Sequence, residues 1–254
     1  MLRIYRLAQT TLAIVLLCLS LEAVAGSAMI AVAGNFTKTA KDLAASFEES
    51  TGHTVVISYG STGKLYAQIL HDAPFEVFLA ADSKHPAMLS EKGKAVPDSI
   101  FTYAKGKVAL FSMDKSLPDQ EEMIKQLMPA VDKLALANPK TAPYGEATIE
   151  ILKSLGLYAD LENKLVLGDN LIQTYQFVYT GNATVGFVSL SQVINEETGS
   201  FWVVPEQHYT PINQDAVLLE KGVNNQVALD FLAFLRSDDA KKIIHHYGYA
   251  TSGE

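Results

Sequence analysis

The 254-residue chain is short of cysteine and of positive charge. Its only cysteine, Cys18, lies in an N-terminal leader, so the rest of the chain can form no disulfide even in an oxidising compartment. Acidic residues outnumber basic residues 28 to 20, which gives a formal charge of −8 and argues against nucleic acid and anionic lipid as partners. Any anion site must therefore use local hydrogen-bond donors instead of a basic field.

Only one long apolar run occurs, and it lies at the N-terminus. This run follows Arg3 and Arg6, and small residues after it suit cleavage near Ala25 or Ala28. We therefore expect residues 1–28 to be a signal peptide for export to the periplasm. The run is shorter than the roughly 20 residues of a membrane-spanning helix. No later segment comes close, so we expect no membrane insertion after cleavage.

Motifs for catalysis and for direct metal ligation are also missing. The six histidines include no His-Glu-x-x-His pair, and the adjacent His245 and His246 point to different faces of a predicted helix. Asp82 follows a predicted strand, where a helix cap or a contact between lobes suits it better than general-base work. No nucleophile, base and orienting acid can be assembled, so we expect neither an enzyme nor a cofactor.

From Met29 onward, short β-rich runs alternate with helical stretches, which is typical of an α/β protein with helices packed on largely parallel sheets. The predicted strands are 30–33, 54–58, 77–80, 108–111, 134–137, 165–167, 185–188 and 216–219. The predicted helices are 37–50, one that starts at 61 or 62, 121–127, 147–155, 171–178, 226–235 and 240–246. No flexible tether separates them, so if the chain forms two lobes, these must share hinge strands.

Short polar residues follow several predicted strands, at points where the first turn of the next helix leaves backbone amides without partners. Four junctions have this form: Gly34-Asn35-Phe36-Thr37, Tyr59-Gly60-Ser61-Thr62-Gly63, the turn from Pro139 to Gly145 that contains Tyr144, and Asp169-Asn170-Leu171. Free amides, hydroxyls and the helix dipole suit an anion. Plain capping or a turn explains each junction taken alone, so an anion site requires the fold to bring them together.

Six stretches of the chain match a known pattern: AVAGNFT at 31–37, GSTGKLYAQI at 60–69, APFEVFLAAD at 73–82, FTYAKGK at 101–107, NP at 138–139 with APYG at 142–145, and GFV at 186–188. Through them the chain resembles the periplasmic molybdate-binding proteins, the substrate-binding components of molybdate ABC transporters. The resemblance implies a type II periplasmic binding protein, with two α/β lobes joined by hinge strands around a ligand cleft. It implies lobe I over 29–107 plus 215–254 and lobe II over 108–214.

The resemblance also implies that neutral donors hold molybdate or tungstate in the cleft, with no direct metal ligand. Asn35 and Thr62 stand where the family has first-lobe donors, and the turn of Tyr144 and the amide of Leu171 match second-lobe contacts. The candidate site residues are Gly34, Asn35, Ser61, Thr62, Tyr144 and Leu171. Where some relatives have a ligand-contacting tyrosine after Gly-Phe-Val, this chain has Ser189, so the contribution of that position stays open.

A site of donors alone also fits the ligand's chemistry, because a doubly charged oxyanion has no proton to donate. Phosphate would favour an acceptor carboxylate in the cleft, and iron would favour a cluster of tyrosines and histidines; the four junctions contain neither. Another oxyanion such as sulfate or phosphate, or a role as a periplasmic sensor subunit, is the alternative. We expect a monomer that closes on its ligand by hinge motion and delivers it to the permease of an ABC importer.

Overall fold

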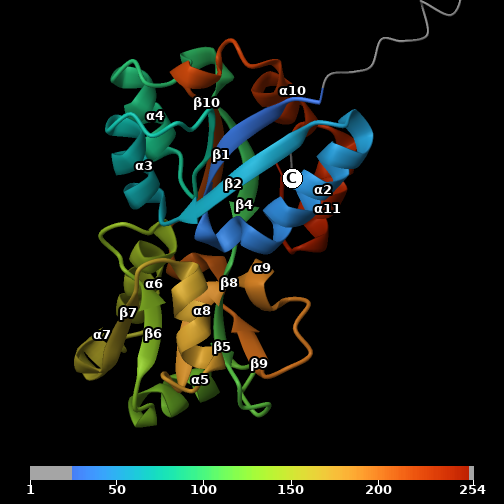
Figure 1. Cartoon of the computed structure of the whole chain (residues 1–254). Coiled ribbons are helices and arrows are strands. Elements are labelled where there is room, and N and C mark those ends of the chain that lie inside the picture. The colour runs from blue at the N-terminus through green and yellow to red at the C-terminus, as the bar shows by residue number, and fades with distance from the viewer. Residues whose placement is uncertain (1–24, 252–254) are drawn as a thin grey trace, which may run out of the picture.

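The computed structural model, which describes residues 25–251, has two α/β lobes, one above the other in Figure 1. Each lobe contains a five-stranded sheet, with strand orders β2-β1-β3-β10-β4 and β7-β6-β8-β5-β9. Cys18 and the expected signal peptide, apart from residues 25–28, lie outside the described residues. Within 25–251, no helix combines the length and the apolar character needed to cross a bilayer.

Lobe I is built from the first part of the described chain and from its last part. Its first elements are β1 (Ser27–Ala33), η1 (Gly34–Phe36), α2 (Thr37–Thr51), β2 (Thr54–Gly60), α3 (Thr62–Leu70), β3 (Val77–Leu79), α4 (Lys84–Glu91), η2 (Pro97–Ser99) and β4 (Phe101–Gly106). The chain returns to this lobe in β10 (Ile212–Leu218), η6 (Glu220–Gly222), α10 (Gln226–Phe234) and α11 (Asp238–His246).

Lobe II is the continuous middle of the chain. Its elements are β5 (Val108–Ser112), α5 (Glu121–Leu127), η3 (Met128–Ala130), β6 (Leu134–Ala137), α6 (Pro143–Ser154), α7 (Tyr158–Leu161), η4 (Glu162–Lys164), β7 (Leu165–Gly168), α8 (Leu171–Tyr179), β8 (Val185–Ser189), α9 (Leu190–Val193), β9 (Ser200–Val203) and η5 (Glu206–His208).

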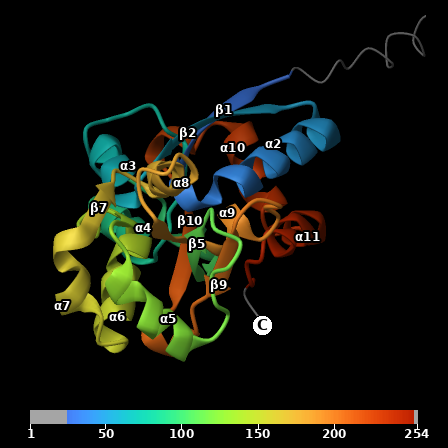
Figure 2. The same ribbon diagram turned by 90° about the horizontal axis from the view of Figure 1, so that it is seen from below.

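Each sheet is covered by helices on both faces, and the alternation of side chains along its strands explains why. In β1, Ile30 and Val32 join the core under α2, α10 and α11, whereas Ala31 joins the core under α3 and α4. Figure 2 shows these two groups of helices on opposite sides of the lobe I sheet. A strand buried on both faces is apolar throughout, which is how β1 was recognised in the sequence.

The sheets are mixed, which corrects the expectation of largely parallel sheets. In lobe I, β1 pairs in parallel with β2 and β3, but β10 pairs antiparallel with β3 and β4. In lobe II, β6 pairs in parallel with β7 and β8, but β5 pairs antiparallel with β8 and β9. The antiparallel pairs arise because β4, β5, β9 and β10 are the strands that lead into and out of the crossovers.

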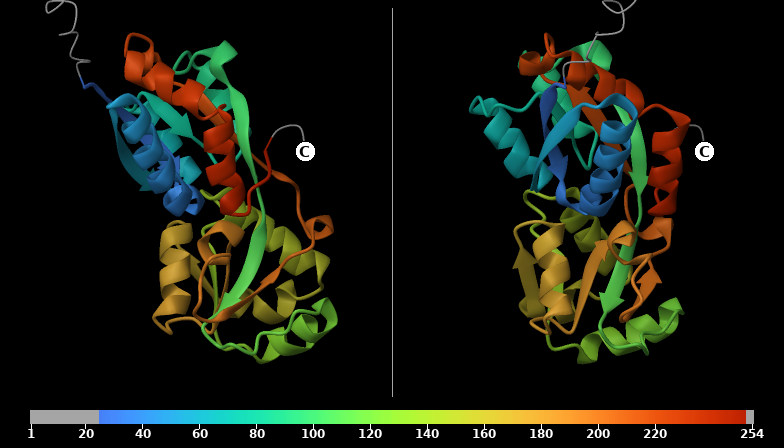
Figure 3. Two further views of the ribbon diagram at one scale, coloured as in Figure 1. Left: turned by 90° about the vertical axis from the view of Figure 1, so that its right-hand side faces the viewer. Right: turned by 45° about the vertical axis from the view of Figure 1, so that its right-hand side comes forward.

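Two crossovers join the lobes. The first is almost one continuous strand, because only Lys107 separates β4 from β5, and Figure 3 shows it running through both lobes. The second runs from β9 to β10. Strand β10 begins to pair with β4 at Ile212. Residues 212–214 therefore belong to the sheet of lobe I, whereas we expected them in lobe II.

The local predictions hold best where one side of a helix is strongly apolar. In α2 the buried residues Ala40, Leu43 and Phe47 follow helical spacing, and Gly52 ends the helix in the left-handed conformation at φ 72°. The helix predicted over 147–155 instead begins at Pro143, which occupies its first turn without a side-chain cap. The sequence patterns missed α4, α7, α9, β4 and β9.

Candidate functional site

A small cavity lies between the lobes, and all six candidate residues line it. The remaining lining residues are Ala33, Ala81, Ala142, Pro143 and Asn170. The wall therefore contains no carboxylate, amine, guanidinium or imidazole. The cavity volume is about 10 Å³, close to the room that a single water molecule needs, so the closed site has no space for a large solute.

Four helix N-termini converge on this cavity, two from each lobe. Lobe I contributes η1, which continues into α2, and α3; lobe II contributes α6 and α8. No side chain caps η1, α3 or α6, whereas Asn170 caps α8 by accepting the N–H of Gln173 at 3.1 Å. First-turn amides have no partner within their own helix, and the helix dipole gives them partial positive charge. The arrangement can therefore hold a compact anion without a charged side chain.

The junction after β2 places two buried hydroxyls in the wall. Thr62 Oγ1 accepts the N–H of Ala81 at 3.0 Å, so its own hydroxyl hydrogen remains to be donated. Ser61 Oγ is buried and has no hydrogen-bond partner within residues 25–251. Leaving a buried polar group unpaired costs about 1–3 kcal/mol, so a hydroxyl held this way in a cavity wall indicates a ligand.

Asn35 lies in the wall, but its side chain also has partners elsewhere in the protein. Asn35 Nδ2 donates to Gln214 Oε1 at 2.5 Å and to the hydroxyl of Tyr249 at 3.0 Å, and its carbonyl accepts from Ser191 Oγ at 2.9 Å. We expected Asn35 from the sequence as an anion donor, but Gln214 and Tyr249 take both hydrogens of its Nδ2, so its backbone N–H is the group that can serve an anion. These partners lie 156 to 214 residues away along the chain, so the sequence around Asn35 did not indicate them.

Tyr144 is the second residue of α6, so its amide belongs to the converging first turns, and its side chain is buried. The hydroxyl accepts from Ser189 Oγ at 3.1 Å and lies against Gly106 in β4, where an added Cβ would be only 2.0 Å away. Burial raises the pKa of Tyr144 well above its usual value, so the hydroxyl stays protonated. Ser189, the position left open by the sequence, thus supports Tyr144 and caps α9.

The lobes touch each other around the cavity. The N–H of Gly63 in α3 donates to the carbonyl of Thr141 in lobe II at 2.8 Å. Lys64 pairs with Asp169 at 2.9 Å, and Lys38 pairs with Glu196. Both ion pairs are partly exposed, and exposed ion pairs contribute little stability individually. The backbone hydrogen bond is therefore the more specific link between the closed lobes.

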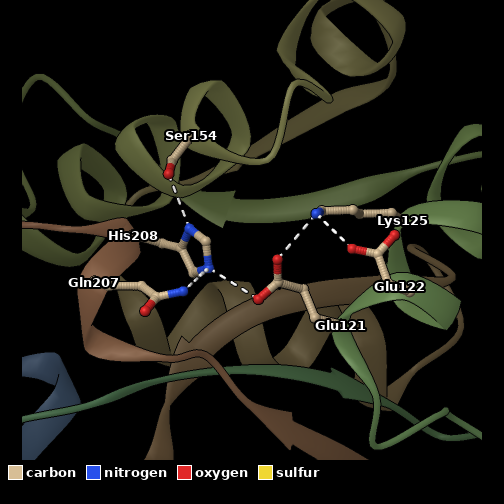
Figure 4. Close-up of polar contacts among 6 residues, drawn as sticks. All are labelled: Glu121, Glu122, Lys125, Ser154, Gln207 and His208. Atoms are coloured by element: carbon tan, nitrogen blue, oxygen red, sulfur yellow. Dashed lines mark hydrogen bonds and ion pairs between the residues drawn. The ribbon is translucent and has the colours of Figure 1, made fainter.

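One cluster outside the cavity resembles a catalytic arrangement. His208 Nδ1 lies 2.8 Å from Ser154 Oγ and His208 Nε2 lies 3.0 Å from Glu121 Oε2 (Figure 4). Hydrogen bonds from Lys125 and then from His208 lower the pKa of Glu121. Ser154 is the last residue of α6, at the negative end of the helix dipole, where an oxyanion is not stabilised. We therefore interpret the cluster as an anchor that ties the second crossover to α5 and α6.

Two lobes, two crossover strands and a small cavity walled by hydrogen-bond donors define a solute-binding protein. Residues 28–250 match the family model of the bacterial extracellular solute-binding proteins, and the chain belongs to this family.

Relatives with solved or curated descriptions cover nearly the whole chain. The chain is 49% identical to the molybdate-binding protein ModA of Rhodobacter capsulatus, over 97% of this chain and 96% of that protein. It is 46% identical to ModA of Azotobacter vinelandii, over 91% and 92%. The solved structure of the Azotobacter vinelandii periplasmic molybdate-binding protein superposes with a TM-score of 0.84 at 37% identity, covering 88% of this chain and 98% of that one.

Proposed function

We propose that this protein captures molybdate or tungstate outside the cytoplasm and delivers it, as a monomer, to the permease of an ABC importer. The observation that carries the proposal is the cavity formed by four helix N-termini and two buried hydroxyls, with no charged side chain in its wall. The names of the relatives at 46–49% identity support the choice of ligand.

The chemistry of the wall supports an unprotonated tetrahedral dianion. Such an ion only accepts hydrogen bonds, and the wall offers amides and hydroxyls that donate. A hydrogen bond to a charged group contributes about 1.5–3 kcal/mol, so six or seven of them offset the desolvation of the ion. A protonated phosphate would leave its own hydrogen without an acceptor, and sulfate is discriminated by its smaller size.

Calorimetric titration of the purified, ligand-free protein tests this proposal. We expect tight one-to-one binding of molybdate and tungstate and little heat with sulfate or phosphate. A preference for sulfate or phosphate, or no response to any of the four anions, would rule out the proposed ligand.

The site assignment makes Gly34, Asn35, Ser61, Thr62, Tyr144 and Leu171 the residues that hold the anion. For Leu171 the donor is the backbone amide, which proline removes. Proline is tolerated at the first position of a helix, and the extended Asn170 before it, at φ −160° and ψ 178°, is compatible with a following proline.

We therefore expect Leu171→Pro to weaken molybdate binding about 10- to 100-fold relative to Leu171→Ala, since only the proline variant loses the N–H. Both variants lose the buried leucine side chain, so their comparison isolates the amide. Isothermal titration of the two variants gives the ratio, and equal dissociation constants would remove Leu171 from the site.

For the signal peptide we propose cleavage after Ala25. Cleavage after Ala28 would remove the first two residues of β1, where Ser27 and Ala28 pair with Thr54 and Val55 of β2. The carbonyl of Gly26 also accepts the N–H of Thr54 at 3.0 Å. The intact mass of the exported protein is expected to correspond to a chain that begins at Gly26; a chain that begins at Met29 would contradict this.

A further inference from the structure

The C-terminal segment after α11 lies between the lobes, beside the first crossover. Lys105 in β4 and Ala250 form an antiparallel bridge, with N–H to carbonyl distances of 2.8 and 3.2 Å. Gly248, at φ 77°, lies against α9 of lobe II, because an added Cβ there would be 3.1 Å from Leu190 Cδ2. The segment therefore contacts a hinge strand and lobe II at once, although it follows a helix of lobe I.

Tyr249, at the centre of this segment, has a buried hydroxyl that reaches both lobes. Toward lobe I it accepts from Asn35 Nδ2 at 3.0 Å and lies 3.0 Å from the carbonyl oxygen of Asn35. Toward lobe II it lies 2.8 Å from Ser191 Oγ and 3.4 Å from Ser189 Oγ. Ser191 donates to the Asn35 carbonyl, so the single hydrogen of the Tyr249 hydroxyl can be donated to Ser191 Oγ in the opposite lobe.

The residue that Tyr249 holds in lobe I is part of the cavity wall. The ring of Tyr249 packs at 5.1 Å from the ring of Phe36, the residue that follows Asn35, so this ring belongs to the packing of lobe I. The hydroxyl extends the contact to lobe II. Burial raises the pKa of Tyr249, which keeps that hydroxyl protonated and able to donate.

We propose that Tyr249 is a positioning residue, whose hydroxyl couples Asn35 in the cavity wall to closure of lobe II over lobe I. This inference rests on the proposed function, because it assigns Tyr249 to the closure of the same anion site. Its bond to Ser191 and its contact with Ser189 form only while the lobes meet, so they slow the opening that releases the ligand. The open form that first meets the ligand lacks them, so association is unaffected.

The variant Tyr249→Phe tests this, since it removes the hydroxyl and keeps the ring on Phe36. Tyr247→Phe is the matched control, because among residues 25–251 the hydroxyl of Tyr247 bonds within lobe I, to Asp42 at 2.7 Å. In stopped-flow measurements with molybdate we expect Tyr249→Phe to raise the dissociation rate constant about tenfold and to leave the association rate constant within about twofold. The control is expected to change neither.

Equal dissociation rate constants in wild type and Tyr249→Phe would overturn the proposal, and so would equal changes in the two variants. A purely structural tyrosine would lower the melting temperature of Tyr249→Phe without changing release. The melting temperatures of both variants therefore accompany the kinetics.

A measurement without ligand separates failure of this inference from failure of the proposed function. Because the mature chain has no native cysteine, spin labels at Glu49→Cys in α2 and Asp160→Cys in α7, both exposed, report the distance between the lobes. We expect Tyr249→Phe to shift the distribution toward longer distances than wild type and Tyr247→Phe. Coinciding distributions would overturn the coupling, whereas lack of molybdate binding by wild type would refute only the ligand.

Discussion

Replacing Thr62 by valine is expected to raise the dissociation constant for molybdate about 10- to 150-fold, since a bond from a hydroxyl to a charged ligand contributes about 1.5–3 kcal/mol. Valine keeps the shape of the side chain and removes only the hydroxyl. In the structure Thr62 Oγ1 already accepts the N–H of Ala81, so its hydrogen is the part left for the anion. Isothermal titration of the purified variant measures the effect.

Thr39→Val is the matched control for this variant. Thr39 is buried in α2 of the same lobe, and its Oγ1 has no hydrogen-bond partner within the described chain. The same substitution there removes an unpaired hydroxyl away from the cavity, so the affinity should not change and the melting temperature should stay equal or rise. If Thr62→Val bound molybdate as tightly as Thr39→Val does, the hydroxyl of Thr62 would not be a ligand donor.

The second large effect is expected from Gly63→Val, which should prevent full closure of the lobes. An added Cβ at Gly63 would lie 3.1 Å from both the Cα and the carbonyl oxygen of Thr141 in the opposite lobe. Overpacking of this kind costs about 1–3 kcal/mol, so we expect molybdate to bind about 10- to 100-fold more weakly. The strain arises only on closure, so the ligand-free variant should keep its melting temperature.

A graded series checks the cause. Gly63→Ala adds only the Cβ and should give a smaller loss of affinity than Gly63→Val, and small-angle X-ray scattering with saturating molybdate should show a larger radius of gyration for the valine variant than for wild type. Equal affinity of all three proteins would show that the contact between Gly63 and Thr141 does not limit closure.

The sequence predicted which residues meet at the cavity better than it predicted what lies behind them. All six candidate residues line one cavity, because each sits where a strand ends and a helix begins, and such junctions have a local pattern of glycine, serine, threonine and asparagine. Leu171, for example, was expected as a first-turn amide and is the first residue of α8.

The partners behind the wall could not be predicted, since no local pattern connects Asn35 with Gln214 or Tyr249. The same reason explains the missed cluster of Glu121, Ser154 and His208. The strand β4 was missed because only three of its residues, at 103, 104 and 106, are buried and the others are half-buried, so this hinge strand lacks a continuous apolar run.

The absence of charged side chains from the cavity wall has a consequence for the conditions in which the protein operates. A compartment outside the cytoplasmic membrane takes on the pH of the medium. The affinity of a site built on histidine or carboxylates would change with that pH. Amides and aliphatic hydroxyls do not titrate, and burial raises the pKa of Tyr144 well above its usual value. The hydrogen-bonding capacity of the wall therefore stays the same from mildly acidic to mildly alkaline media, whereas the protonation of the proposed anion changes with pH.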